Sequence, residues 1–338
     1  MSTSTIIIAE AGVNHNGDPG IARTLIEKAK ECGADAVKFQ LFKVASLVSE
    51  ESPVADYQRN NTGETSQFDL LRKLELSEKD FSVLKTYAER LGIDFFLSPF
   101  DEESLVSISR MGIDTIKIPS GEITNLPFLK AIARQKKKVI LSTGMSTMEE
   151  VEIAVEILLN EGVSSDHLCI LQCTTEYPAP KNEINLLAMV EMGKKFGLKY
   201  GFSDHTEGYE VTLAAVALGA SVIEKHFTLD KAMDGPDHRA SLDPDEFTEM
   251  TRLIRNVEKA LGNGVKKPSA TELRNASIVR KSLFSSRLIQ KDKEISVSDI
   301  TFLRPGDGIS PAELDRVIGK KARNLIPPGK KISWEDLE

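Results

Sequence analysis

Two stretches decide the fold of this chain: Phe202–Thr206, with the sequence FSDHT, and Ile223–Thr228, with the sequence IEKHFT. Each runs from an apolar, strand-like segment into a polar cluster that contains a histidine. His205 and His226 are therefore expected at the ends of neighbouring parallel strands, where an α/β barrel carries its chemistry. Imidazoles in such positions are suitable ligands for a divalent metal ion.

The chain contains eight short, mostly apolar runs of the kind expected for strands that are buried on both faces. Helical patterns separate most of them, and Asp18-Pro19, Ser77, Thr147 and Asp243 supply start signals for four helices. Eight β/α units over about 260 residues predict a TIM (β/α)8 barrel, in the α/β class. The predicted strands are Thr5–Ala9, Asp35–Phe39, Asp94–Leu97, Thr115–Ile118, Lys138–Leu141, Leu168–Cys173, Lys199–Phe202 and Ser221–Ile223.

Composition limits the class of protein. The chain has 338 residues, 41% of them hydrophobic, which is enough for one large core and a smaller companion domain. A net charge of -8 argues against a nucleic-acid or anionic-membrane partner. No apolar run approaches the roughly 20 residues of a membrane span, and the N-terminus lacks signal-peptide features. We expect a cytoplasmic protein whose three cysteines, Cys32, Cys169 and Cys173, are reduced thiols.

The domain organisation follows from changes in composition. We predict a barrel domain over residues 1–264, an exposed linker over 265–279 and a small β-rich domain over 280–338, where short segments alternate with Pro and Gly. The last domain is small for an independent core, so we expect it to dock on a partner. The long polar connection between Lys43 and Leu76 follows the second strand and predicts a lid or an oligomer contact.

Polar side chains follow every predicted strand, which a purely structural core would not require. Because the carboxyl ends of parallel barrel strands surround one bowl, these side chains are expected to share a ligand site. The candidates are Glu10, Lys38, Gln40, Ser98, Lys117, Ser120, Glu122, Ser142, Thr175, Tyr177, Ser203, Asp204, His205, Glu224 and His226.

Lys38 and Lys117 lie inside apolar strands. Either could extend its amine to the surface, but an inward-facing lysine at a barrel mouth usually meets an anion or forms a Schiff base. Two such lysines with Ser98, Ser120 and Ser142 nearby fit a doubly anionic ligand, such as a phosphate with an adjacent carboxylate.

His205 and His226 are candidate metal ligands, although either could be a packed core imidazole. Two protein ligands do not make a tight zinc site. They fit a looser site that borrows oxygens from substrate and water, with Mn²⁺ or Mg²⁺ as the ion. His15 is ambiguous and His167 is predicted at the surface. Asp237, in a turn beyond the last strand, either binds sugar hydroxyls or simply makes the turn.

Three carboxylates are candidates for general acid–base work on a water molecule: Glu10, Glu122 and Glu224. The residues alone do not rank them.

The motifs above resemble those of the sialic acid synthase family, and the resemblance covers essentially the whole chain. That family condenses phosphoenolpyruvate with an N-acetylmannosamine-type sugar, and its members end in an antifreeze-like SAF domain of the β-clip type. The matching segments, in order, are AEAGVNHNG at 9–17, VKFQ at 37–40, KIPSGE at 117–122, STGM at 142–145, TEYP at 175–178, SDHT at 203–206, EKHFT at 224–228, GPDH at 235–238 and LRPG at 303–306.

The resemblance implies a role for each matching residue. It implies that His205 and His226 bind the metal, that Glu10 is the catalytic carboxylate, and that Arg304 reaches the sugar from the partner subunit of a domain-swapped homodimer. Phosphoenolpyruvate would contact Lys38, Ser98, Lys117, Ser120 and Ser142, with Ser98 standing where some members carry threonine. The sugar would contact Gln40, Thr175, Tyr177, Ser203, Glu224 and Asp237.

The resemblance also implies a divalent metal cofactor, Mn²⁺ first, with Mg²⁺ or Co²⁺ as alternatives. Thr175 stands where some neuraminate synthases carry asparagine, and its surroundings look more like synthases of N,N′-diacetyllegionaminate. Two rival hypotheses remain: a metal-independent Schiff-base lyase or aldolase that uses Lys117, and a non-catalytic sugar-binding or antifreeze-type protein.

Overall fold

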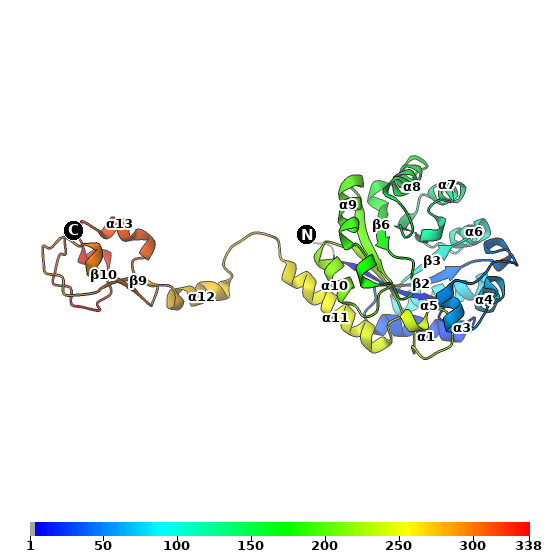
Figure 1. Cartoon of the computed structure of the whole chain (residues 1–338), viewed down its shortest axis with the longest axis horizontal. Helices are drawn as coiled ribbons and strands as arrows, with labels where there is room; N and C mark the ends of the chain where they lie inside the picture. Colours follow the sequence, from blue (N-terminus) through cyan, green and yellow to red (C-terminus); the bar gives the residue numbers. More distant parts are fainter. Residues whose placement is uncertain (1–3) are drawn as a thin grey trace. The chain divides into compact units, whose positions relative to one another are not determined.

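The computed structural model describes residues 4–338, which form two compact units, one ending at Gly262 and one beginning at Asn263. In the first unit, eight parallel strands pair in sequence order and close into a barrel (Figure 1). The predicted TIM barrel is therefore confirmed. Its strands are β1 (Ile6–Gly12), β2 (Ala36–Leu41), β3 (Asp94–Pro99), β4 (Thr115–Ile118), β5 (Lys138–Ser142), β6 (Leu168–Cys173), β7 (Lys199–Asp204) and β8 (Val222–His226).

Helices surround the strands (Figure 1), and their apolar faces pack with the outward-facing strand residues in the main core. The helices predicted from Asp18, Ser77, Thr147 and Asp243 begin where expected, because each of these side chains accepts a hydrogen bond from a first-turn backbone N–H. The barrel unit contains α1 (Pro19–Glu31), α2 (Val44–Leu47), α3 (Asp56–Thr62), α4 (Gln67–Leu74), α5 (Glu78–Leu91), α6 (Glu102–Arg110), α7 (Leu126–Ala133), α8 (Met148–Asn160), α9 (Leu186–Phe196), α10 (Glu210–Ala217) and α11 (Pro244–Leu261).

Two strands extend further than their apolar runs. β1 continues through Glu10 to Gly12, and β8 continues through Glu224 to His226. The two extensions pair with each other, with Glu10 opposite His226, and the register between β1 and β2 shifts between Glu10 and Gly12. The apolar pattern ends early because Glu10, Glu224 and His226 face a polar cavity, where a buried side chain does not need to be apolar.

The long connection between β2 and α5 is helical. α2 and α4 contribute to a small apolar core formed by Val13, Phe42, Val44, Val54, Leu70 and Leu74, whereas α3 has no buried residue. This insertion follows β2 at the C-terminal face of the barrel, which is the face that carries the polar strand ends.

The second unit contains α12 (Ala270–Val279), which occupies most of the segment predicted as a linker, and then the small domain. Ser269 is the N-cap of α12. This helix was not predicted, because the Lys- and Ser-rich composition of the segment indicated a linker. In the small domain, β9 (Ser282–Ser285) pairs antiparallel with β10 (Ile300–Leu303), and α13 spans Leu314–Val317. The apolar core of this domain is Leu283, Ile289, Ile295, Ile300, Ile309, Val317, Ala322, Ile326, Ile332 and Leu337.

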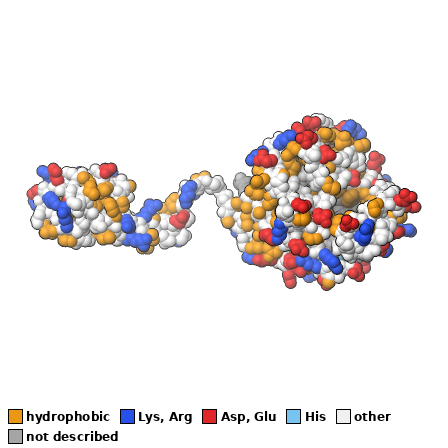
Figure 2. Space-filling model, in the orientation of Figure 1, with side chains coloured by type: hydrophobic (Ala, Val, Ile, Leu, Met, Phe, Trp, Pro, Cys, Tyr) orange, Lys and Arg blue, Asp and Glu red, His pale blue; other side chains and the backbone are white. Residues whose placement is uncertain are grey.

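Acidic and basic side chains are interspersed over the face of the barrel unit that Figure 2 shows. None of the helices within residues 4–338 combines the length and the apolar character that crossing a bilayer requires.

Candidate active site

A cavity of about 200 Å³ opens at the C-terminal ends of the barrel strands. Its wall contains fourteen of the fifteen residues to which the family resemblance assigns a role, the exception being Arg304 in the second unit, whereas the further candidates Glu122 and Asp204 are not on the wall. These fourteen are Glu10, Lys38, Gln40, Ser98, Lys117, Ser120, Ser142, Thr175, Tyr177, Ser203, His205, Glu224, His226 and Asp237.

Both lysines point into the cavity and are almost fully buried. The Nζ atom of Lys38 lies 2.8 Å from Glu10 Oε2 and donates to Ser98 Oγ at 3.1 Å. The Nζ atom of Lys117 lies 3.2 Å from Glu224 Oε1 and donates to Ser142 Oγ at 2.8 Å. The alternative of surface-extended lysines is therefore wrong.

The two carboxylates differ in their electrostatic surroundings. Burial raises the pKa of Glu10, and the attraction of Lys38 only partly offsets this effect. Burial acts in the same direction on Glu224, but Lys117 and Lys38 outweigh it and hold the pKa of Glu224 at about 2. Glu224 is also fixed by Ser203 Oγ, which donates to it at 2.8 Å. Glu224 therefore stays ionised, whereas Glu10 takes up a proton more readily than an ordinary glutamate.

The rings of His205 and His226 lie side by side, with centroids 5.4 Å apart, and the ring of Tyr177 contacts both. His205 Nδ1 is hydrogen-bonded to the Thr174 carbonyl oxygen at 2.6 Å, so this ring nitrogen carries the proton and Nε2 faces the cavity as an acceptor. Burial lowers the pKa of His205 to about 4 and that of His226 well below its usual value. Both imidazoles are neutral at physiological pH, the form that binds metal ions.

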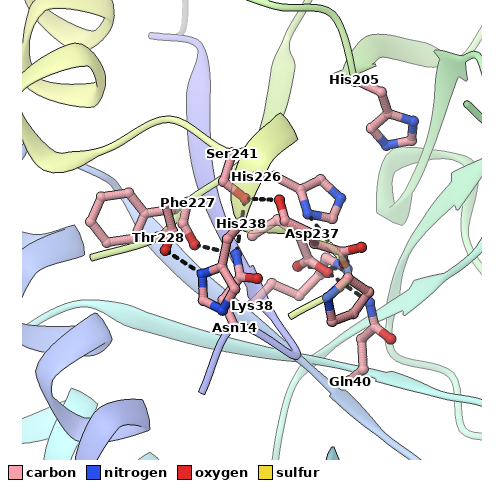
Figure 3. A network of polar contacts seen from close by, with 12 residues as sticks. Asn14, Lys38, Gln40, His205, His226, Phe227, Thr228, Asp237, His238 and Ser241 are labelled. Atoms are coloured by element: carbon pink, nitrogen blue, oxygen red, sulfur yellow. Dashed lines mark hydrogen bonds and ion pairs between the residues drawn. The ribbon is translucent and has the colours of Figure 1, made fainter. Parts of the chain in front are cut away.

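The loop after β8 is held by a separate polar network (Figure 3). Asn14 donates to the Phe227 carbonyl oxygen and to Ser241 Oγ, each at 2.9 Å, and Ser241 donates to the Asp237 carbonyl oxygen at 2.7 Å. This network places Asp237 Oδ2 3.7 Å from His226 Nδ1. Asp237 therefore does more than make a turn, since its carboxylate lies on the cavity wall.

The cavity wall suits a divalent cation that takes only some of its ligands from the protein. No group of three or more His, Cys, Asp or Glu within residues 4–338 is arranged to enclose a metal ion. Yet His226 Nδ1 is a buried polar atom without a hydrogen-bond partner among the described residues, and so is Glu224 Oε2, which lies 3.7 Å from Lys38 Nζ. Two neutral imidazoles with carboxylate oxygens nearby are the donor set that Mn²⁺ and Mg²⁺ accept, provided that further oxygens come from elsewhere.

Several wall residues were not among the predicted ones. Tyr57 and Gln58 come from α3, and Leu71 and Leu74 come from α4. The ring of Tyr57 lies 5.0 Å from that of Tyr177. The position of the insertion after β2 predicted a lid or an oligomer contact, but no local pattern marked these side chains as part of the site.

Other predicted candidates lie elsewhere. Glu122 is not on the cavity wall and is hydrogen-bonded to Asn125 Nδ2 at 2.8 Å, so the choice of acid–base residue narrows to Glu10 and Glu224. His15 is buried against Phe39, and its Nδ1 accepts from the Gly17 N–H. His167 is exposed, as predicted. All three cysteines are free thiols, and Cys173 Sγ lies 3.1 Å from Ser120 Oγ on the cavity wall.

The fold and the cavity define the class of protein: a TIM-barrel enzyme with a buried polar site at the carboxyl ends of its strands. Residues 25–266 match the NeuB family, and residues 280–338 match the SAF domain. The chain therefore belongs to the NeuB family of biosynthetic enzymes, and the predicted sialic acid synthase resemblance and SAF domain are confirmed.

Named relatives support this family across almost the full chain. The N,N′-diacetyllegionaminic acid synthase of Campylobacter jejuni is 49% identical, covering 94% of this chain and 96% of the relative. The enzyme of the same name from Legionella pneumophila is 45% identical, covering 100% and 96%. The crystal structure of N-acetylneuraminic acid synthetase from Leptospira borgpetersenii, in complex with citrate, is 32% identical and has a TM-score of 0.71, covering 81% of this chain and 90% of that one.

Proposed function

We propose that this chain condenses phosphoenolpyruvate with 2,4-diacetamido-2,4,6-trideoxymannose to give N,N′-diacetyllegionaminate and phosphate. The observation that carries the reaction type is that two buried lysines, each hydrogen-bonded to a serine, share one cavity with a third serine and two neutral histidines. The choice of sugar rests on the names of the two relatives at 49% and 45% identity. N-acetylmannosamine is the alternative sugar.

Phosphoenolpyruvate fits the half of the cavity that contains Lys38 and Lys117. It carries a phosphate and a carboxylate, and each lysine has a serine hydroxyl within hydrogen-bonding distance that can share an anionic oxygen. The lysines bind charge that is present before the reaction begins, so their main contribution to the rate is orientation. Binding must also loosen the contacts of the lysines to Glu10 and Glu224.

His205 and His226 would hold the metal ion, for which we propose Mn²⁺. A bound ion would supply Lewis-acid polarisation of the carbonyl oxygen of the open-chain sugar. Gln40, Tyr177 and Asp237 lie around the same opening and can position the sugar hydroxyl and acetamido groups. Thr175 Oγ1 is buried and has no hydrogen-bond partner among the described residues, so it offers a polar contact to a sugar substituent.

Carbon C3 of phosphoenolpyruvate would attack the aldehyde carbon of the sugar, which leaves cationic character at C2. Water would add at C2, and phosphate would leave with cleavage of its C–O bond. Glu10 is the residue that would take the proton from this water. Its Oε1 accepts from Gln40 Nε2 at 3.3 Å, and its Oε2 is ion-paired with Lys38 Nζ at 2.8 Å.

The rival Schiff-base hypothesis has less support in the geometry. Burial lowers the pKa of Lys117, but its ion pair with Glu224 and its hydrogen bond to Ser142 favour the protonated amine, whereas a Schiff base requires the free amine. Treatment with borohydride and pyruvate should therefore leave the protein unmodified.

The proposal is tested by phosphate release from phosphoenolpyruvate in the presence of Mn²⁺, with the two sugars compared at matched concentrations. We expect kcat/KM for the diacetamido sugar to exceed that for N-acetylmannosamine by about 100-fold, which is nearly 3 kcal/mol of transition-state discrimination. The reverse preference would reassign the sugar. Release with neither sugar would refute the proposed reaction.

A matched variant tests the sugar contact. Thr175→Asn should shift preference toward N-acetylmannosamine, because the larger amide takes space from a second acetamido group. If the ratio of the kcat/KM values for the two sugars is unchanged, Thr175 does not determine sugar specificity.

A further inference from the structure

Asp204 and Lys225 form an ion pair on the side of β7 and β8 that faces away from the cavity. Both side chains are completely buried, and Lys225 Nζ lies 3.3 Å from Asp204 Oδ2. The two residues are partners in the register of β7 and β8. Because side chains alternate along a strand, their neighbours Ser203, Glu224 and His226 face the cavity instead.

The carboxylate of Asp204 is surrounded by donors. Its Oδ1 accepts from the Thr206 N–H at 2.8 Å and from Thr206 Oγ1 at 2.7 Å. Its Oδ2 accepts from Thr212 Oγ1 on α10 at 2.6 Å. Asp204 and Thr206 flank His205, so these bonds fix the backbone on both sides of that imidazole.

Lys225 extends the same network into the next strand. Its ammonium group also donates to the Thr206 carbonyl oxygen at 2.5 Å. Lys225, which directly precedes His226, is therefore bonded to both residues that flank His205. The rings of the two histidines lie in contact on the other side of this connection.

Stability alone is a weak reason for a buried ion pair at this place. Desolvation of two charges offsets most of their attraction, and well-packed apolar residues often replace such pairs without loss of stability. What an apolar pair does not provide is direction: the ammonium and carboxylate groups fix the relative position of two backbone segments through several oriented bonds. That property matters where two side chains must share one ligand.

We propose that Asp204 and Lys225 are positioning residues that set the spacing of the His205 and His226 imidazoles for a divalent cation. The inference rests on the metal site of the proposed function. Neither side chain contacts the cation; each acts through the backbone of the histidine that follows it. Residues that orient metal ligands from outside the coordination shell typically contribute 10- to 100-fold to metal affinity.

The test is a Mn²⁺ titration of the full chain, followed by the electron paramagnetic resonance signal of free Mn²⁺. Lys225→Met should raise the dissociation constant for Mn²⁺ by about 10- to 100-fold and lower kcat, with KM for phosphoenolpyruvate nearly unchanged. Lys225→Arg keeps the charge and the donors, so it should restore most of the affinity. Thr212→Val removes one donor to Asp204 and should give a smaller loss.

Met250→Ala supplies the control for a general loss of stability. Met250 is fully buried on α11, away from β7 and β8 in sequence, and its truncation creates a cavity without removing any polar contact. It should lower the melting temperature and leave Mn²⁺ affinity unchanged. If it weakens Mn²⁺ binding as much as Lys225→Met does, the proposal is overturned.

The remaining outcomes also decide the question. Wild-type Mn²⁺ affinity in a folded Lys225→Met variant would overturn the proposal. If that variant does not fold, the Mn²⁺ affinities of Thr212→Val and Lys225→Arg decide instead. His226→Ala marks the site, because bound Mn²⁺ must disappear in that variant. If the wild-type chain and His226→Ala bind the same amount of Mn²⁺, the metal site of the proposed function is refuted. This outcome is distinguishable from a failure of the positioning role alone.

Discussion

Glu10 and Glu224 lie in the same cavity, but their surroundings suit them to different tasks. The raised pKa of Glu10 favours proton uptake, whereas the pKa of Glu224, at about 2, keeps that carboxylate charged. Pairs of carboxyl groups with diverging pKa values are a common basis for acid–base division of labour in enzymes. In this chain the division follows from Lys117, which contacts Glu224 at 3.2 Å.

Glu10→Gln should lower kcat by about 100- to 10,000-fold, because the amide cannot accept the proton of the attacking water. Steady-state kinetics with saturating phosphoenolpyruvate and sugar measure the effect. Glu122→Gln is the matched control and should retain nearly full activity, since Glu122 is not on the cavity wall. A large loss in Glu122→Gln with a mild effect in Glu10→Gln would reverse the assignment.

Asp299 should make the stability of the SAF domain depend on pH. Its buried carboxylate accepts from Arg287 Nε at 2.6 Å, Lys293 Nζ at 2.8 Å and the Ser296 N–H at 2.9 Å. Burial alone would raise the pKa of Asp299, but the bonds from Lys293, Ser296 and Arg287 outweigh it and lower that pKa.

The stabilisation from a lowered pKa is fully present above the unfolded value, near pH 4, and is lost as the pH falls toward the folded value. Asp299→Asn should therefore lower the unfolding free energy by about 2 kcal/mol at pH 7 and flatten its decline below about pH 4. Chemical denaturation of both proteins between pH 7 and pH 3 measures this. Parallel pH profiles would show that Asp299 is not the responsible group.

Helix α3 makes the insertion after β2 part of the active-site cavity, because Tyr57 and Gln58 lie on the cavity wall. Tyr57 lies against Tyr177, and Asn61 Nδ2 donates to the Pro236 carbonyl oxygen at 2.7 Å, next to Asp237. The helix is thus tied to the loop that presents a predicted sugar contact.

Tyr57→Ala should raise KM for the sugar by about tenfold, the effect of losing one good aromatic contact, and leave KM for phosphoenolpyruvate nearly unchanged. Initial rates with each substrate varied in turn separate the two constants. Arg59→Ala, on the exposed part of the same helix, is the control and should behave as wild type. Equal changes in both KM values would mean that α3 does not act on the sugar alone.

The strands and the main helices were predictable because their signals are local. Short apolar runs mark buried strands, and capping residues such as Ser77 and Thr147 mark helix starts. The full length of β8 was not predictable from apolarity, since Glu224 and His226 are buried by a polar cavity. The site residues of α3 were not predicted for a different reason. Tyr57 becomes part of the site only through tertiary packing against Tyr177, and no periodicity in the sequence indicates this contact. The ion pair of Asp204 and Lys225 likewise depends on strand register.

For the whole molecule, the barrel core does not depend on the second unit. Every residue of the main apolar core lies before Gly262. A chain ending at Gly262 should therefore fold, with a cooperative thermal transition, and should show almost no turnover if Arg304 completes the sugar site. Wild-type rates from this truncated chain would refute the role of Arg304.

Mixing two inactive full-length variants distinguishes the source of Arg304. We propose a domain-swapped homodimer in which each site takes Arg304 of the partner subunit. After subunit exchange between Glu10→Gln and Arg304→Ala chains, half of the dimers are mixed and each mixed dimer has one intact site, so about a quarter of wild-type activity should return. No recovery, with exchange demonstrated by mass, would place Arg304 in the same chain as the site it serves.

The pairing of each site lysine with a glutamate has a consequence for product inhibition. An anion that enters the cavity must compete with carboxylates that are already in place, so a charge on phosphate is not by itself enough for tight binding. Phosphoenolpyruvate offers a second anionic group to the same pair of lysines, whereas inorganic phosphate offers only one. The phosphate released in each turnover should therefore leave readily, and the enzyme should keep working as that co-product accumulates around it.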